Sequence, residues 1–461
     1  MDTLLSFLKN LDEKSFYLEE SGKKYFKEDV HKLVSKVKKD FQSVANFENK
    51  KVFLDIKDRK LFIIVFFSLL ELNAKPVLIP PEIKIIDYFY PDGIFISDNK
   101  FHDEIINVNS DFSISLGVNF NPENKQNEAA DEDKAIYLYT SGSTGKPKLI
   151  PKSNKNLISE IGELKKILDV SSESVFYFTA PICHIYGFLN GFLLPLYSSA
   201  KIILDPKFTP QDVAGFVNQK RITHLVSIPS YYRMFLEMNL ISMFNNCQSL
   251  ISSSAPLPLD VSKVFYENGV RITEIYGSTE TGGIAHRVSA ENIEWKLYSY
   301  VKIISDWAEY TDIEEEKVNE LKIDSPAISV DYDSNSGFNT GDVVCFSDNG
   351  NFKLLGRNTR FVKISGKRVD LHSVLEKIIK YLNEIDGYFI KEEELYIDQK
   401  DGKIYLISEK ELPKKHKEIK DDLKHLLPSY AVPRLFIISK ISRNNMGKIK
   451  KTEIDKIIGN K

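Results

Sequence analysis

Residues 140–148 read TSGSTGKPK and follow the strand-like run AIYLY at 135–139. Glycine lets a backbone approach a polyanion closely and adopt positive φ angles. Hydroxyl groups supply neutral hydrogen-bond donors and lysines supply positive charge. The run therefore predicts a loop that wraps a phosphate chain. Its polar and glycine residues are Thr140, Ser141, Gly142, Ser143, Thr144, Gly145, Lys146 and Lys148.

The spacing of this loop differs from two common phosphate sites. A Walker A loop needs four residues between its first glycine and its Gly-Lys pair, and a dinucleotide site needs a three-glycine turn. Taken alone, residues 140–148 are also compatible with a mobile surface linker. The rest of the chain has to decide between these alternatives.

Six further blocks stand in a fixed order along the chain. They are APICHIYGF (180–188), SSSAP (252–256), EIYGSTETG (274–282), NTGD (339–342), LLGRNTRFVKISGKRV (354–369) and MGKIKKTEI (446–454). With the loop at 140–148, these blocks resemble the acyl-adenylate-forming enzymes, which include acyl-CoA synthetases, luciferases and peptide-synthetase adenylation domains. The resemblance extends from a helical pattern near residue 27 to the end of the chain.

Composition agrees with a globular enzyme. The 461 residues are enough for more than one domain, and 42% hydrophobic and 28% charged residues are ordinary values. Cys183, Cys247 and Cys345 form no CxxC spacing, so neither a disulfide framework nor a zinc site is indicated. The longest apolar run, 61–72, is too short to span a bilayer. With no signal peptide apparent, we expect a cytoplasmic protein without a transmembrane segment and without a nucleic-acid partner.

Alternating helical and strand-like patterns predict an α/β fold of doubly wound parallel sheets. Helical patterns occur at 29–41, 59–73, 154–168, 210–219 and 259–267, and strand-like runs occur at 51–57, 75–80, 174–179, 201–204, 224–227, 249–252 and 271–276. Residues 320–355 instead predict short strands of a small β subdomain. Charge balance changes after Gly356, and the family's two domains meet there. We therefore expect an N-terminal AMP-binding domain at 1–356 and a small mobile α+β domain at 357–461.

The resemblance implies attack of a carboxylate on the α-phosphate of ATP, which gives an acyl-AMP and pyrophosphate. A thiol, from CoA or from another phosphopantetheine, usually then takes the acyl group. In this family the loop at 140–148 holds the β- and γ-phosphates, Thr279 donates to the α-phosphate, and Glu280 is the Mg²⁺ ligand. The same resemblance implies that the nucleoside would be held by Ser254, Ala255, Pro256, Glu274, Tyr276, Asp342 and Arg357.

The residue expected to drive adenylation is Lys448, in the Gly447-Lys448 pair, where it would bridge the carboxylate and the α-phosphate. The alternative is a solvated lysine beside Lys450 and Lys451. His184 is expected to border the carboxylate entrance and position the substrate, because a carboxylate needs no general base at pH 7. The alternative for His184 is a packing role.

Departures from the family pattern limit these assignments. Leu149-Ile150 stands where Gly-Val is common, Glu274 where Asn, Gln or Asp is common, and Thr359 at the hinge position. The stretch at 387–394 looks shortened, so loss of the thiol-transfer step stays open. Three functions remain: an acid–thiol ligase, an adenylate-forming enzyme with another acceptor or none, and a nucleotide-binding regulatory protein that has lost its chemistry.

Substrate and acceptor are predicted from three further features. Ile185 stands where amino-acid-activating relatives have an aspartate, so a fatty, hydroxy-fatty or aryl acid is favoured over an α-amino acid. Gly366 would leave room for a pantetheine arm. Residues 357–461 carry 24 Lys and Arg against 16 Asp and Glu, a surplus that slightly favours an acyl carrier protein over CoA.

Overall fold

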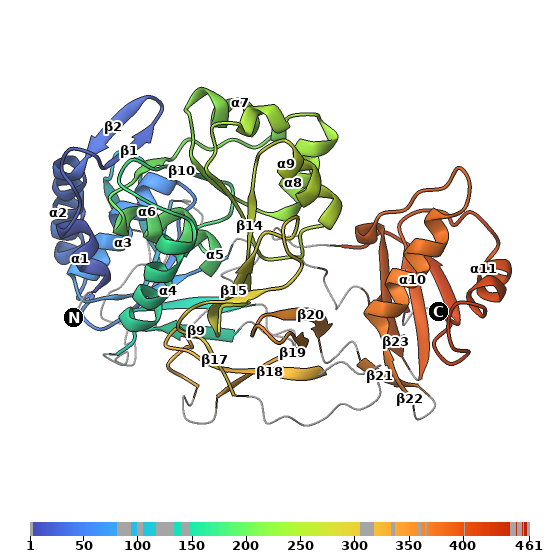
Figure 1. The fold of residues 1–461 in the computed structure, drawn as a ribbon. Coiled ribbons are helices and arrows are strands. Elements are labelled where there is room, and N and C mark those ends of the chain that lie inside the picture. Colours follow the sequence, from blue (N-terminus) through green and yellow to red (C-terminus); the bar gives the residue numbers. More distant parts are fainter. Residues whose placement is uncertain are drawn as a thin grey trace. The chain divides into compact units, whose positions relative to one another are not determined.

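The computed structural model describes residues 3–80, 94–98, 105–116, 133–140, 148–304, 318–332, 337–357, 361–364, 367–400, 402–442, 449, 454 and 456–458. The chain divides into two compact units, and Figure 1 labels their helices and strands. Unit 1 comprises residues 1–302 and 324–338, and unit 2 comprises residues 303–323 and 339–461. No helix in the described ranges is long and apolar enough to cross a membrane.

The larger sheet of unit 1 has, among the described residues, the strand order β16-β15-β14-β13-β12-β10-β11-β1-β2. In chain order its strands are β1 (Tyr17–Glu20), β2 (Lys23–Phe26), β10 (Val175–Phe178), β11 (Lys201–Ile203), β12 (His224–Ser227), β13 (Ser249–Ser252), β14 (Ile272–Ser278), β15 (Gly282–Arg287) and β16 (Lys296–Leu297). From β14 across to β1 neighbouring strands pair in parallel, and the outer strands β2, β15 and β16 are antiparallel. The central strands β12 and β13 are buried along their whole length, as expected for a parallel sheet covered on both faces.

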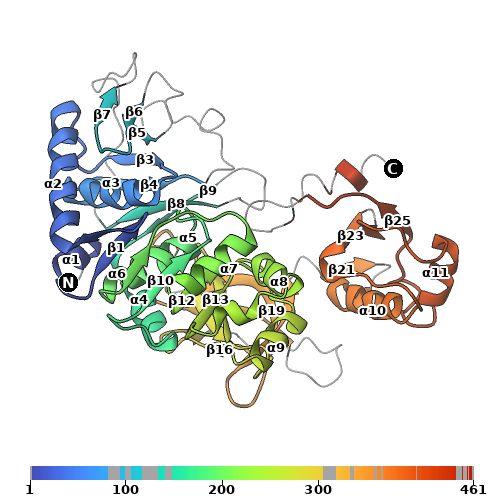
Figure 2. The ribbon, with the colours of Figure 1, turned by 90° about the horizontal axis from the view of Figure 1, so that it is seen from above.

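Helices cover both faces of this larger sheet (Figure 2). On one face α7 (Pro210–Gln219), α8 (Pro229–Glu237) and α9 (Leu259–Glu267), with the 3₁₀ turn η4 (Ile241–Phe244), share a core with Tyr177 of β10. Phe178 follows Tyr177 and therefore faces the other way. There it contacts Gly191 of the π-helix η3 (Phe188–Leu193). On this second side lie α4 (Asn154–Ile167), α5 (Ile185–Gly187) and α6 (Leu194–Tyr197).

The second sheet of unit 1 has, within the described segments, the order β7-β6-β5-β3-β4-β8-β9. Its strands are β3 (Lys51–Asp55), β4 (Lys75–Leu78), β5 (Ile94–Ser97), β6 (Ile106–Val108), β7 (Ile114–Leu116), β8 (Ile136–Thr140) and β9 (Lys148–Lys152). α1 (Leu4–Lys9), α2 (Lys27–Val44) and α3 (Arg59–Glu71) belong to this half of the unit. The α3 side chains from Lys60 to Leu69 are all buried, so α3 is enclosed on every side.

Phenylalanine rings join the two halves of unit 1. Phe66 of α3 lies 5.4 Å from the Phe188 ring and 5.6 Å from the Phe192 ring, both of η3. Phe62 is 5.9 Å from Phe192 in an edge-on arrangement. These tilted contacts are the preferred geometry for aromatic pairs. The helix layer between the sheets therefore holds them in one packed core.

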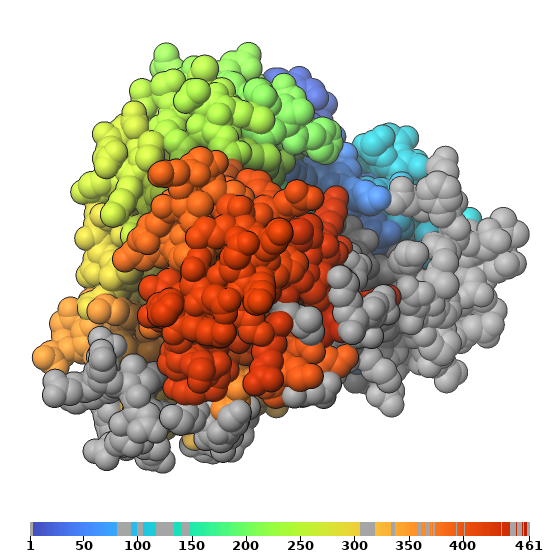
Figure 3. Space-filling view, turned by 90° about the vertical axis from the view of Figure 1, so that its right-hand side faces the viewer, coloured from blue at the N-terminus to red at the C-terminus, as the bar shows by residue number. Residues whose placement is uncertain are grey.

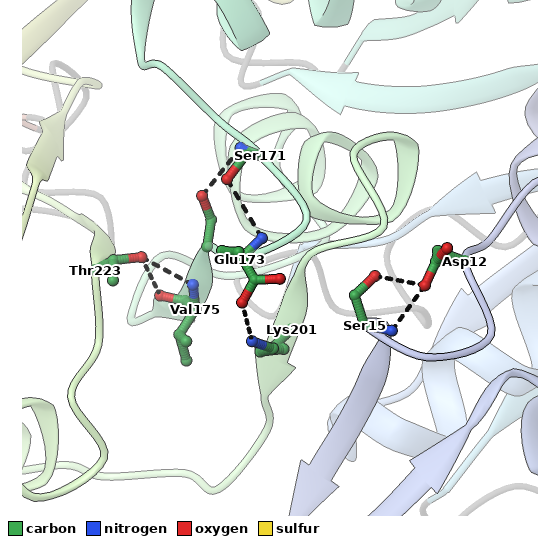
Figure 4. Close-up of polar contacts among 8 residues, drawn as sticks. Asp12, Ser15, Ser171, Glu173, Val175, Lys201 and Thr223 are labelled. Carbon is green, nitrogen blue, oxygen red and sulfur yellow. Dashed lines mark hydrogen bonds and ion pairs between the residues drawn. The ribbon is translucent and has the colours of Figure 1, made fainter.

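Short polar contacts fix the turns that lead into β10 and β11 (Figure 4). The Val175 N–H donates to Thr223 Oγ1 at 2.8 Å, and Lys201 Nζ is 3.1 Å from a Glu173 carboxylate oxygen. The Glu173 N–H donates to Ser171 Oγ at 3.3 Å. The bonds from the Glu173 and Val175 N–H groups satisfy backbone donors at the start of β10, and the Lys201–Glu173 ion pair joins the side chains at the starts of β10 and β11.

Unit 2 contains three small sheets in its described part. The strands β17 (Lys302–Ile303), β18 (Val318–Asp324), β19 (Phe338–Phe346) and β20 (Phe352–Arg357) form one sheet, although Lys302, Asp324 and Phe338 are counted with unit 1. The hairpin β21 (Phe361–Ile364)–β22 (Lys367–Asp370) forms the second, and β23 (Leu395–Lys400), β24 (Lys403–Ser408) and β25 (Leu435–Ile438) form the third. The helices α10 (Leu371–Asn383) and α11 (His416–Leu423) bury an apolar face in one core with β23 and β24, and a 3₁₀ turn, η6 (Glu392–Glu394), precedes β23. In Figure 3 the described residues of this unit from 339 onward are coloured orange to red.

The α/β class predicted from the sequence is confirmed, as is a small β sheet in the 320–355 region. That sheet groups with the C-terminal residues, because unit 2 takes in 303–323 and 339–356. The predicted domain boundary at 356/357 lies inside unit 2 and stays a prediction. Several helical elements were not predicted from the sequence, among them α8 and η3 in unit 1 and α10 and α11 in unit 2.

Candidate active site

The two ends of the predicted phosphate loop lie on neighbouring strands of the second sheet. Thr140 ends β8, Lys148 begins β9, and the two residues pair across the antiparallel ladder. Ser141, Gly142, Ser143, Thr144, Gly145 and Lys146 lie outside the described residues. Lys148 Nζ donates to the Tyr332 hydroxyl at 2.6 Å, a bond that raises the pKa of Lys148. The predicted phosphate loop therefore lies between the end of β8 and the start of β9, two strands that pair with each other.

Most of the other predicted unit 1 residues gather at the carboxyl edge of the larger sheet. His184 follows β10, Ser254 follows β13, and Thr279 and Glu280 follow β14. Parallel strands place their carboxyl ends at one edge, which is where open α/β sheets bind ligands. The parallel strand order therefore places these blocks, which are far apart in the sequence, at one edge of the sheet.

The turn that carries Thr279 and Glu280 is tightly built. The ladder between β14 and β15 shifts register between Tyr276 and Gly277. A Cβ at Gly277 would lie 2.2 Å from the Gly282 carbonyl oxygen, so only glycine fits this close approach. The buried Thr281 hydroxyl is 3.0 Å from Ser278 Oγ and donates to the Gly282 carbonyl at 2.8 Å. These bonds fix the turn and leave Thr279 and Glu280 half-buried beside it.

The ring of Tyr276, the predicted adenine platform, lies beside the ring of Trp295. Its ring is 5.5 Å from that of Trp295, and the Arg287 guanidinium lies 4.2 Å from the Trp295 ring centre. Trp295 is buried. The rings of Tyr276 and Trp295 are inclined by 51°, and the half-buried Tyr276 can offer a flat face to a ligand.

Glu274, predicted to accept from the adenine amino group, takes part in a buried ion pair. Both of its carboxylate oxygens accept from Arg287, at 2.9 Å from Nε and 3.1 Å from Nη2. The Glu274 side chain is only 4% exposed. If Glu274 also accepts from the adenine amino group, it must do so with a carboxylate whose two oxygens already accept from Arg287. The predicted contact with adenine is therefore limited to the remaining lone pairs of that carboxylate.

The segment after β13 has strained backbone at one residue. Ser254 has a φ of 79°, which is uncommon for a residue with a side chain. Ser253 Oγ donates to the Ile275 carbonyl at 2.8 Å and so links the segment to β14. Ser254 and Ala255 are half-buried and Pro256 is exposed. Backbone strain of this kind is concentrated at functional sites.

His184 begins the short helix α5, with its backbone N–H bonded to the Pro181 carbonyl at 3.2 Å. Tyr186, two residues later, is buried, and its hydroxyl lies 2.8 Å from the Ser227 carbonyl oxygen and 2.7 Å from that of Ile251. Those carbonyls are at the ends of β12 and β13, so the turn at His184 is fixed to the same sheet edge. Sequence reasoning missed this role of Tyr186.

In unit 2, the two remaining residues that were predicted to hold the nucleoside are neighbours. Asp342 of β19 and Arg357 of β20 are direct partners in the antiparallel ladder. Asp342 is 5% exposed, and its backbone N–H donates to Thr340 Oγ1 at 3.1 Å. Gly366, Lys448 and the hinge residue Thr359 lie outside the described residues.

A buried charge pair beside the turn was also missed from the sequence. Lys152 is 1% exposed and Glu160 is 5% exposed. Burial lowers the pKa of Lys152 and raises that of Glu160, and each charge partly offsets the effect on the other. The available signal was Glu160 itself, a carboxylate within the apolar face formed by Leu157, Ile161 and Leu164 of α4.

A magnesium ion would depend on Glu280 and on the phosphates it accompanies. Within the described residues, no group of three or more His, Cys, Asp and Glu side chains is placed to hold a metal ion. Mg²⁺ at nucleotide sites is held by one or two carboxylates together with phosphate oxygens and waters. The half-buried Glu280 carboxylate fits that donor set.

Residues 89–321, half of the chain, match the family model described as AMP-binding enzyme. The chain belongs to the AMP-binding enzyme family. The matched range includes the predicted phosphate loop, His184, the Ser254 segment and the Tyr276–Glu280 turn.

Relatives of known name within the AMP-binding enzymes are distant. The chain is 26% identical over 372 residues to the mitochondrial malonate–CoA ligase ACSF3 of Homo sapiens, and 26% identical over 361 residues to the probable CoA ligase CCL5 of Humulus lupulus. These matches cover 69% and 72% of this chain but 64% of each relative's length.

Solved structures share the fold across the whole chain. ATP-bound MatB from Rhodopseudomonas palustris superposes with a TM-score of 0.81 at 18% identity, covering 98% of both chains. The O-succinylbenzoate coenzyme A synthetase MenE from Bacillus subtilis, in complex with AMP, gives a TM-score of 0.77 at 18% identity, covering 98% of both chains.

Proposed function

We propose that the protein is an ATP-dependent carboxylic acid ligase that forms an acyl-AMP and passes the acyl group to a phosphopantetheine thiol. The observation that carries the proposal is the family match over 89–321 together with Tyr276, Thr279 and Glu280 at the carboxyl edge of the larger sheet. The relatives named as CoA ligases support a thiol acceptor.

In the first step a substrate carboxylate oxygen attacks the α-phosphorus of ATP. The bond between that phosphorus and the oxygen bridging to the β-phosphate breaks, and pyrophosphate leaves. The phosphate loop at 140–148 would hold the leaving phosphates, Thr279 would donate to the α-phosphate, and Lys448 would neutralise charge shared by the two reacting groups. Glu280 would hold Mg²⁺, which supplies further charge neutralisation when it is bound.

Separate residues are proposed to hold the base and the ribose of the nucleoside. Tyr276 would stack on the adenine, with Ser254, Ala255 and Pro256 along the other face. Asp342 would accept from the ribose hydroxyls with help from Arg357. His184 would position the carboxylate and would not act as a base.

In the second step the sulfur of the thiol attacks the acyl carbonyl carbon. The carbon–oxygen bond to the phosphate breaks, AMP leaves, and the thiol proton passes to solvent. The segment containing Gly366 is the proposed passage for the pantetheine arm. The acceptor is CoA or the phosphopantetheine of an acyl carrier protein.

For the acid, a fatty, hydroxy-fatty or aryl compound is proposed over an α-amino acid. An ammonium group beside Ile185 would have no counter-charge there, and an uncompensated buried charge costs several kcal/mol. We also propose a cytoplasmic location.

The test is pyrophosphate release from ATP with a panel of acids. The panel holds malonate, a long-chain fatty acid, its hydroxy derivative, 4-coumarate, O-succinylbenzoate and several amino acids, with an acid-free control. Release with one acid class supports adenylation, and selective release with an amino acid would overturn the substrate proposal. Release with none of them, despite ATP binding, would favour a regulatory nucleotide-binding protein.

A further inference from the structure

The turn from Glu280 to Gly283 is held at its two ends by buried groups of opposite charge. Lys152 Nζ donates to the Glu280 carbonyl at 3.2 Å. At the other end the Gly283 N–H donates to Glu160 Oε1 at 2.8 Å. Neither group belongs to the proposed reaction, yet both bond to the turn that carries Glu280.

The two glycines of this turn make room for the carboxylate. A Cβ at Gly282 would lie 2.5 Å from Glu160 Oε2, and one at Gly283 would lie 2.9 Å from Glu160 Oε1. Gly282 also has a φ of 68°, which disfavours any other residue. The local sequence is therefore fitted to Glu160 specifically.

Lys152 also connects the turn to two other segments. Its Nζ donates to the Ala327 carbonyl at 2.7 Å, and Lys152 itself ends β9, the strand that leaves the phosphate loop. The Ser329 N–H donates to the same Glu280 carbonyl at 2.8 Å, and Ser329 Oγ donates to the Pro151 carbonyl at 2.7 Å. The buried Lys152 ammonium thus joins three segments. Lys152 is the last residue of β9, and its Nζ donates to Glu280 in the turn and to Ala327.

We propose that Lys152 and Glu160 form a charge clamp that positions the Thr279–Glu280 turn against the phosphate-loop hairpin, so that Glu280 meets Mg²⁺·ATP in one orientation. Charged hydrogen bonds in a low-dielectric site are strong and directional, which suits a positioning role. The clamp acts through Glu280 and touches no substrate. Its part in catalysis rests on the proposed function, but its part in Mg²⁺·ATP binding does not.

The experiment compares Lys152→Met, Glu160→Gln and the double variant, with Lys155→Met as the matched control because Lys155 is exposed on the same stretch. ATP binding is measured at a series of Mg²⁺ concentrations, without any acid. We expect Lys152→Met to raise the Mg²⁺ concentration at half-maximal ATP binding by roughly 10-fold, the usual effect of losing a group that orients a metal ligand. Lys155→Met should leave it unchanged.

The double variant separates positioning from simple charge balance. It buries no unpaired charge, and Gln at 160 can still accept from Gly283, so thermal stability should recover relative to Lys152→Met. A positioning role predicts that the Mg²⁺ dependence stays shifted while stability recovers. Recovery of both would show a structural role only and would overturn the proposal.

An acid-dependent assay then distinguishes the two hypotheses. If wild type binds Mg²⁺·ATP but activates no acid, the proposed function fails and the clamp is still decided by the Mg²⁺ series. If wild type activates an acid, Lys152→Met should reduce the adenylation rate with little change in KM for the acid. The clamp proposal would be overturned if Lys152→Met needed the same Mg²⁺ concentration as wild type for half-maximal ATP binding. It would also be overturned if ATP binding by the wild type did not depend on Mg²⁺.

Discussion

Lys448 is the single side chain on which the proposed adenylation depends most. We expect Lys448→Ala to lower adenylation by roughly 10²-fold or more, because a preorganised charge aimed at the transition state is lost. Thioester formation from presynthesised acyl-AMP should fall much less. Single-turnover assays of the two half-reactions measure the difference, with Lys450→Ala as the neighbouring-lysine control. Equal losses in both half-reactions would contradict the assignment.

Single side chains also show where sequence reasoning stops. The block EIYGSTETG predicted part of a nucleotide site, and in the structure Thr279 and Glu280 of this block follow the carboxyl end of β14. The same block gave no sign that Glu274 is bonded to Arg287, because β15 had not been recognised as its partner. Lys152 contacts residues 128 and 175 positions away in the chain. Contacts at such separations depend on the topology and leave no local pattern.

The turn between β14 and β15 gives a prediction about a strand end. We expect Gly277→Ala to destabilise the protein by about 1–3 kcal/mol, since the new Cβ would meet the Gly282 carbonyl oxygen and force the backbone to move. Adenylation should fall as well, because the turn carries Thr279 and Glu280. Urea unfolding and pyrophosphate release measure the two effects.

The matched control is Gly162→Ala in α4. A Cβ there meets no atom within 4 Å, and alanine exceeds glycine in helix propensity by up to about 1 kcal/mol. Gly162→Ala should therefore be neutral or stabilising and fully active. A Gly277→Ala variant as stable and active as this control would refute the tight-turn interpretation.

The middle of the larger sheet gives a prediction about pH. His224 of β12 is fully buried, stacks on Phe176 at 4.6 Å, and its Nε2 is 3.0 Å from the Leu168 carbonyl oxygen. Burial lowers the pKa of His224, with a partial offset from the Leu168 carbonyl and from Asp169. The folded-state pKa is thus below the unfolded value of about 6.5. Keeping His224 neutral in the folded state therefore adds to the free energy of unfolding above the unfolded pKa of about 6.5. This contribution is lost as the pH falls through the lowered pKa of the folded state.

The measurement is urea unfolding at about pH 7.5 and pH 5.5, on either side of the ordinary histidine pKa. Wild type should lose more stability on acidification than His224→Gln, in which no imidazole titrates. The same loss in both proteins would show that other groups cause the acid sensitivity.

Among the elements, those with local signals were predicted best. The helix α7 begins at Pro210 after the capping residue Thr209, and the sequence predicted its observed bounds. The π-helix η3 was missed because its hydrogen bonding differs from the 3.6-residue period on which helix prediction rests. The small β sheet was predicted, but its grouping with the C-terminal residues depends on packing that no short window contains.

For the complete enzyme, the second half-reaction is the next test. If the segment with Gly366 admits a pantetheine arm, a leucine there should fill the passage. We expect Gly366→Leu to block thioester formation and to spare pyrophosphate release with the same acid. Loss of both activities would instead indicate a defect in folding or in nucleotide binding, and retention of both would exclude the passage.

The distribution of charge over the chain bears on which thiol is used. Residues 357–461 carry 24 Lys and Arg against 16 Asp and Glu, while the whole chain has a net charge of −3. CoA and acyl carrier proteins present the same phosphopantetheine, so the passage does not discriminate between them. A carrier protein adds an extended acidic surface, and distributed charge on both partners raises their rate of association.

We therefore expect acylation of a carrier protein to be faster than acylation of CoA at low salt. It should also weaken more steeply as salt is added, because charges on opposing surfaces are screened within about 10 Å at 0.1 M ionic strength. Pyrophosphate release, measured at the same salt concentrations without any thiol, controls for effects on adenylation. If CoA is acylated efficiently and no carrier protein is acylated, the positive charge of residues 357–461 does not serve to bind a carrier protein.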